Sequence, residues 1–111
     1  MSRWMRPIPR RLLPDDMMVR PSNGDGSFGD ARLIRHVWFQ GSQSASSDDH
    51  RSADAGTGKV FVDAVNSEGA FEVPAGSRVT LSGMTTSLSV ISCKRCCVIR
   101  GEVHHWELTV R

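Results

Sequence analysis

The sequence predicts an all-β fold: a small closed or partly closed antiparallel β-barrel of about six strands. Short runs rich in β-branched and aromatic residues alternate with polar residues, turn-forming residues separate these runs, and no stretch has the apolar periodicity of a helix. A closed barrel would also leave no exposed strand edge to promote aggregation. With 111 residues, the chain has room for one domain with one modest core.

The expected strands follow one another with polar segments between them. They cover residues 16–20, 31–40, 59–65, 78–81, 87–92 and 103–110. Alternation predicts which residues of a strand share a face. In the second strand it places Leu33, Arg35, Val37 and Phe39 on one face, and Ile34, His36 and Trp38 on the other. Val79 and Leu81 are likewise expected to share one face of their strand, and so are Leu88 and Val90. In the last strand, one face is expected to carry His104, Trp106, Leu108 and Val110, and the other His105, Glu107 and Thr109.

Glycine, proline and asparagine mark the expected turns. Residues 22–30 (SNGDGSFGD) contain three glycines and predict a hairpin turn with positive φ between the first two strands. Residues 66–69 form a second turn, and 71–73 lead into a third at 74–76 (PAG). These signals separate the later strands.

The first fourteen residues differ from the barrel domain expected over 15–111. They carry four arginines, no acidic residue, and prolines at 7, 9 and 14, so we expect an extended basic arm rather than a helix. Such an arm can contact phosphate or an acidic protein surface, or it can be a solvated tail.

Residues 41–57 (GSQSASSDDHRSADAGT) form a long insertion between the second and third strands. The segment has five serines and no large apolar residue, so it cannot bury enough surface to order itself. Loops of this length inside a small domain are usually functional or disordered. Its three aspartates and one arginine give a net charge of −2, which would repel DNA phosphate.

Catalytic motifs are not apparent. Gly56-Thr57-Gly58-Lys59 lacks the earlier glycine, the following Ser or Thr and the helix of a phosphate-binding loop. Serine, histidine and aspartate occur together only in 41–57, a poor scaffold for a preorganised nucleophile. We therefore expect neither an enzyme nor a cofactor. The net charge of +2 is too small to indicate nucleic-acid binding by the whole protein.

The cysteines Cys93, Cys96 and Cys97, followed by His104 and His105, suggest soft metal ligands. Adjacent cysteines on a strand point to opposite faces, so only one of Cys96 and Cys97 could reach a shared metal. We interpret the three as small apolar residues near a strand end and predict no metal. An odd number of cysteines also argues against a disulfide framework.

Four segments, in order along the chain, resemble the minor capsid proteins that phages encode among their head-to-tail connector genes. They are 6–14 (RPIPRRLLP), 60–67 (VFVDAVNS), 74–80 (PAGSRVT, with a glycine turn at Gly83) and 101–110 (GEVHHWELTV). Residues 83–100 depart from that family's usual hairpin, since they carry the cysteines in place of a glycine and an aromatic residue.

The resemblance extends to the stopper, or head-completion, proteins of long-tailed phages. It implies a barrel that assembles as a ring beneath the portal and adaptor, closes the DNA channel after packaging and docks the tail. The loop between the second and third strands would face the channel, through Ser47, Asp48, Asp49, His50 and Arg51. The assembly arm would consist of Arg3, Arg6, Pro7, Ile8, Arg10, Arg11, Leu12 and Leu13.

The aromatic residues Trp38, Phe61 and Trp106 are the expected core or interface anchors. The expected partners are a homo-oligomeric ring (dodecamer or hexamer), portal or adaptor proteins, and a tail-completion or tail tube protein. Packaged double-stranded DNA would be contacted without sequence specificity. The expected location is the virion neck, after synthesis in the host cytoplasm, with no membrane contact.

Two other functions are compatible with the residues alone. A nucleic-acid-binding barrel of the OB type also has about five strands, although an aromatic and basic binding face is not apparent. A zinc-dependent interaction module would use the cysteines and a histidine.

Overall fold

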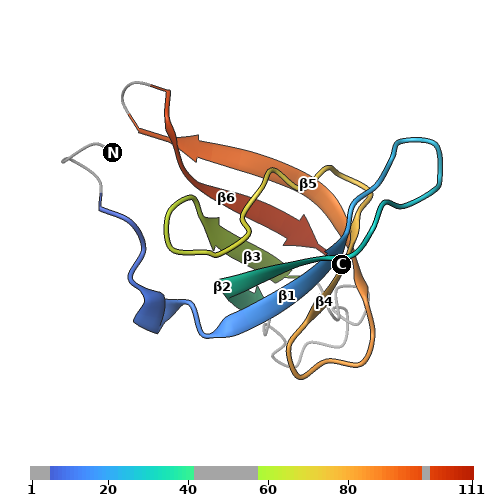
Figure 1. Ribbon diagram of the computed structural model, residues 1–111, viewed down its shortest axis with the longest axis horizontal. Helices are drawn as coiled ribbons and strands as arrows, with labels where there is room; N and C mark the ends of the chain where they lie inside the picture. Colours follow the sequence, from blue (N-terminus) through green and yellow to red (C-terminus); the bar gives the residue numbers. More distant parts are fainter. Residues whose placement is uncertain (1–5, 42–57, 99–100) are drawn as a thin grey trace, which may run out of the picture.

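A computed structural model describes residues 6–41, 58–98 and 101–111 of the chain (Figure 1). Six antiparallel strands form a closed barrel in the order β1-β2-β3-β6-β5-β4, which confirms the predicted fold. The strands are β1 (Asp15–Arg20), β2 (Arg32–Gly41), β3 (Gly58–Asp63), β4 (Arg78–Leu81), β5 (Leu88–Cys97) and β6 (Val103–Val110). The described helical segment is one short 3-10 turn, η1 (Arg10–Leu12). No helix in the described part of the chain has the length and apolar character needed to cross a membrane.

The strand boundaries agree closely with the sequence except in β5. The predicted strand stopped at residue 92, whereas β5 continues through Cys97. Its second half pairs with β6, with Cys93 opposite Leu108 and Cys96 opposite His105. Figure 1 shows these two strands side by side as one long hairpin. The cysteines therefore lie within a strand pair rather than in a connecting segment, and the register of that pair shifts between Cys96 and Cys97.

The core fills the barrel and is almost entirely aliphatic. Its buried residues are Met17, Val19, Ile34, Val37, Val60, Val62, Val73, Val79, Leu81, Leu88, Val90, Leu108 and Val110. The predicted pairs Val79 with Leu81, Leu88 with Val90, and Leu108 with Val110 all point inward. Burial of these side chains is the main stabilising contribution to the barrel.

One predicted face assignment is wrong, because β2 contains a bulge. Ile34 and Val37 were placed on opposite faces, yet both side chains are 0% exposed. His36, between them, has a φ of 62°. In the pairing with β1, Asp15 lies opposite Val37 and Asp16 opposite Arg35, so His36 has no partner in the register. The extra residue reverses the side-chain alternation of the strand.

The predicted turns are present at all three positions. The 22–30 hairpin is closed by a hydrogen bond from Asn23 N to Ser27 O, 3.0 Å long. Gly24, Gly69 and Gly76 have positive φ in the respective turns. Val73, between the last two turns, is fully buried. The connection between β3 and β4 therefore contributes a side chain to the core.

The amino-terminal segment is less extended than the sequence predicted. Pro9 is extended, but Arg10–Leu12 form the 3-10 turn η1, which the prediction of a wholly extended arm missed. Leu13, directly after the turn, is only 1% exposed. The predicted arm of residues 1–14 therefore includes a residue, Leu13, that is buried in the protein.

Candidate functional site

An apolar pocket lies on the outside of the barrel, between the amino-terminal segment and strands β2 and β3. It is lined by Ile8, Arg11, Leu12, Pro14, Trp38 and Phe61. The rings of Trp38 and Phe61 stack with their centroids 5.1 Å apart. Trp38 is 39% exposed and Leu12 is 51% exposed, so large apolar side chains face solvent here. We call this surface the apolar pocket.

The predicted aromatic anchors fall into two places. Trp38 and Phe61 lie in the apolar pocket, outside the core. Trp106 is half-buried against the core and donates an Nε1 hydrogen bond to Glu72 at 3.3 Å. The carboxylate of Glu72 also accepts two bonds from Arg95, at 2.6 and 3.2 Å. Trp106 is therefore committed to contacts within the chain.

The amino-terminal segment is held against its own barrel by backbone hydrogen bonds. The N–H of Ile8 donates to Asp63 Oδ1 at 2.9 Å, and the carbonyl of Ile8 accepts a bond from Asn66 Nδ2 at 2.8 Å. The carbonyl of Arg6 lies 2.6 Å from His104 Nε2. These bonds fix one wall of the apolar pocket, while the side chains of Arg6, Arg10 and Arg11 remain exposed.

Asp63 is the key residue of this attachment, and the sequence analysis missed it. Its side chain is 0% exposed. Besides the bond from Ile8, its Oδ2 accepts bonds from the N–H groups of Val65 and Asn66 at 2.9 and 2.7 Å. An aspartate just before a predicted turn is the available signal, because such carboxylates often bind the backbone N–H groups that follow. The bond from the Ile8 N–H could not be predicted in the same way, because Ile8 lies 55 residues before Asp63 in the sequence.

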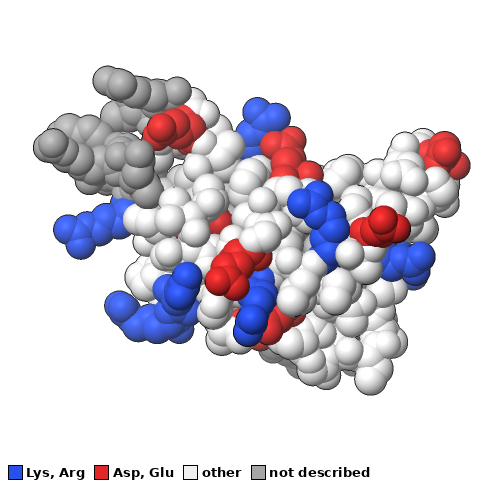
Figure 2. Space-filling model, in the orientation of Figure 1, with Lys and Arg blue, Asp and Glu red and all other residues white. Residues whose placement is uncertain are grey.

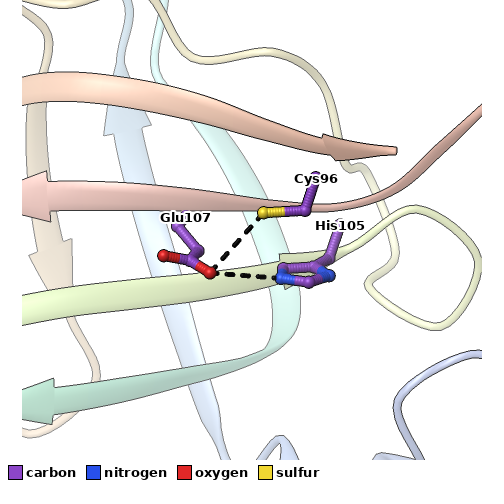
Figure 3. A group of neighbouring side chains, drawn as sticks. All are labelled: Cys96, His105 and Glu107. Carbon is purple, nitrogen blue, oxygen red and sulfur yellow. Dashed lines mark hydrogen bonds and ion pairs between the residues drawn. The ribbon is translucent and has the colours of Figure 1, made fainter. Parts of the chain in front are cut away.

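A polar cluster lies beside the apolar pocket, where β5 and β6 pair. It consists of Cys96, His105 and Glu107, which we call the Cys-His-Glu cluster (Figure 3). Cys96 Sγ and His105 Nε2 each lie 3.5 Å from the same oxygen, Glu107 Oε2. The ring of His105 also lies 6.2 Å from that of Phe61. The cluster and the apolar pocket are therefore neighbours on one outer face.

The charges in the cluster influence one another. Burial opposes ionisation of Glu107, but hydrogen bonds from Cys96 and His105 and the charge of Lys59 outweigh it and hold the Glu107 pKa below its usual value. Lys59 Nζ lies 3.7 Å from the other carboxylate oxygen, Oε1. Burial raises the pKa of the Cys96 thiol, and the Glu107 carboxylate adds to that effect. Thiol, imidazole and carboxylate are all donor types that bind transition metals.

The other two cysteines lie outside this cluster. Cys93 is half-buried against the core, and burial raises its thiol pKa. Cys97 is exposed. The sequence argument that Cys96 and Cys97 could not both face one site agrees with this arrangement. It did not consider Glu107, which supplies the third polar group.

Several predicted site residues lie outside the described residues. They are Arg3 of the arm and the proposed channel residues Ser47, Asp48, Asp49, His50 and Arg51. On the face shown in Figure 2, basic and acidic side chains are interspersed. The described residues of that face therefore form no broad surface of a single charge.

Comparison with known proteins identifies the family. No curated protein and no solved structure matches the chain. The family model described as "Minor capsid protein" matches residues 9–110, which include all six strands of the barrel. The chain therefore belongs to this minor capsid protein family, and it is a structural β-barrel component of a phage virion.

Proposed function

We propose that this protein is a subunit of the phage head-to-tail connector, where it forms a ring that closes the DNA channel after packaging and docks the tail. The family match over residues 9–110 carries the proposal, because it makes the chain a component of the virion. Ring formation, the neck position and channel closure are the proposed steps beyond that match.

The apolar pocket supports assembly through this face of the barrel. Large apolar side chains that gather at one exposed place favour contact with a partner, and tryptophan is among the residues that contribute most to interfaces. Trp38 and Leu12 are the most prominent side chains available there. We propose that a neighbouring copy in the ring covers them.

The amino-terminal segment supplies the charge of this interface. Arg10 and Arg11 are exposed beside the apolar pocket, and their backbone is held by η1. A fixed pair of cations beside an apolar surface favours an acidic rim on the partner. We propose that this rim belongs to the neighbouring subunit or the adaptor ring.

The segment between β2 and β3 is the proposed channel element. Gly41 and Gly58, which flank this segment in the sequence, are register partners at one end of that strand pair. Their composition gives a net charge of −2. A channel lining of that sign would let DNA pass without adhering to it.

Cryo-electron microscopy of the neck in purified virions tests the location. We expect a ring of these barrels on the channel axis between head and tail. Density for the protein in the head shell instead would contradict the proposal.

Substitution of Trp38→Ser tests the interface. Loss of a tryptophan anchor costs about 2 kcal/mol or more in typical interfaces, so incorporation into virions should fall at least roughly tenfold. Ile91→Ser is the matched control, because Ile91 is an exposed apolar residue of β5 (51%) that does not line the apolar pocket. Equal incorporation of the two variants, with unchanged thermal stability, would exclude this surface as the interface.

A further inference from the structure

We infer that Cys96, His105 and Glu107 form a binding site for a divalent transition metal, with Zn²⁺ as the best match. The site goes beyond the proposed connector function and does not depend on it. Its donors come from two neighbouring strands, with Cys96 opposite His105 in the register and Glu107 two residues further along β6.

The donor separations are close to those of a tetrahedral zinc site. Zinc bonds of ~2.0–2.3 Å place neighbouring tetrahedral donors ~3.3–3.7 Å apart. Cys96 Sγ and His105 Nε2 each lie 3.5 Å from Glu107 Oε2, and the three donor atoms all lie within 4.8 Å of one another. Figure 3 shows the sulfur and the imidazole converging on that one oxygen. The third pair of donors, Cys96 and His105, lies within the same 4.8 Å limit.

The second ring nitrogen of His105 has the partner that a metal-binding histidine usually has. His105 Nδ1 lies 2.8 Å from His104 Nδ1, and His104 Nε2 lies 2.6 Å from the Arg6 carbonyl. A carbonyl only accepts, so His104 Nε2 carries the proton and, in neutral His104, Nδ1 accepts. His105 Nδ1 then donates, so Nε2, which hydrogen-bonds to Glu107 Oε2 in the metal-free protein, can bind a metal through its lone pair once it has lost its proton. Hydrogen bonds of this type orient metal-binding histidines and raise their basicity.

The surrounding charges leave the donor atoms available. Lys59 contacts Glu107 Oε1 and leaves Oε2 to the cluster. Lys94 lies opposite Glu107 in the register and adds a second positive charge beside the cluster. Metal binding would displace the thiol proton and any proton on His105 Nε2, so the affinity should fall as the pH is lowered.

The donor types also select the metal. A thiolate with an imidazole and a carboxylate suits zinc and its neighbours, whereas Mg²⁺ and Ca²⁺ prefer oxygen donors alone. Three protein donors leave a fourth position for water, as in open zinc sites.

Titration of the full-length protein with Co²⁺, followed by displacement with Zn²⁺, tests the site. We expect one Co²⁺ per chain, a thiolate-to-cobalt charge-transfer band, proton release and a higher melting temperature with Zn²⁺. A folded wild-type protein that gives no such band, or a band that Cys97→Ser removes, would overturn the proposal.

Variants assign the donors. Cys96→Ser and His105→Gln should each weaken binding at least roughly tenfold, and Glu107→Gln should weaken it with the charge-transfer band retained. His104→Gln should weaken binding about 10- to 100-fold as a positioning residue. Cys97→Ser, one position from Cys96, is the matched control and should bind as the wild type does. Thermal melts without metal check that each variant is folded, and unchanged binding by folded Cys96→Ser would exclude the site.

Discussion

Two carboxylates on neighbouring strands illustrate different ways of holding a charge in this barrel. Asp63 is fully buried, and three backbone N–H groups donate to its carboxylate. Glu107 is 23% exposed, and its partners are the side chains of Lys59, Cys96 and His105. Asp63 is opposite His105 in the pairing of β3 with β6, so the two environments are adjacent.

The difference lies in whether the partners can be exchanged. Backbone donors carry no titratable proton and cannot be replaced by an ion, so Asp63 has a fixed structural role. It joins the turn after β3 to the amino-terminal segment and thereby shapes the apolar pocket. The partners of Glu107 can gain or lose protons, rotate, or bind a metal. Glu107 is therefore the carboxylate suited to reversible binding.

The largest effect expected from this contrast is on folding stability. Asp63→Ala leaves the N–H groups of Ile8, Val65 and Asn66 without an acceptor, and loss of such charged hydrogen bonds should cost about 3 kcal/mol or more. Glu107→Ala should cost less than about 1 kcal/mol in the absence of metal, as for most exposed ion pairs. Urea denaturation of the isolated chain measures both. Equal losses would show that Asp63 has no special role in attaching the amino-terminal segment.

A smaller effect is expected on the acid side of the stability profile. Because the pKa of Glu107 is lower in the folded protein than its ordinary value of 4.5, ionisation of this group stabilises the fold. That contribution is complete at neutral pH and is lost as the pH falls through 4.5 and below. Glu107→Gln should remove this part of the acid dependence, amounting to less than about 1 kcal/mol. Denaturation at several pH values in the presence of a chelator measures it, and an unchanged profile would contradict the assigned interactions.

The barrel and its strands were predictable because they depend on local patterns. Turn residues and alternation gave all six strands, with β4 and β6 matched to the residue. The bulge at His36 was not predictable, because His36 is an extra residue only relative to the register of β2 with β1. A single sequence does not show that register. The extension of β5 was missed for a similar reason, because the residues from Cys93 to Cys97 form a strand through their pairing with β6.

The candidate site was predicted less well than the fold. The sequence drew attention to the cysteines, to Trp38 and to Phe61, but the apolar pocket also needs the turn of η1. The Cys-His-Glu cluster depends on the register of β5 with β6, which places Cys96 beside two β6 residues. Residues brought together by strand pairing leave little trace in a single sequence.

The smallest expected effect is a difference in reactivity among the three thiols, with no change in stability. Cys97 is exposed, whereas burial raises the pKa of Cys93 and of Cys96. The thiolate is the reactive form, so iodoacetamide at neutral pH should modify Cys97 first and the other two more slowly. Peptide mass spectrometry over time measures the order, with urea-unfolded protein as the control in which the three rates converge.

Added Zn²⁺ should protect Cys96 further and leave Cys97 unaffected, because only Cys96 shares its donor cluster with Glu107. Faster modification of Cys96 than of Cys97 in the folded, metal-free protein would mean that burial and Glu107 do not keep the Cys96 thiol protonated. The proposed contrast between Asp63 and Glu107 would then be wrong for Glu107.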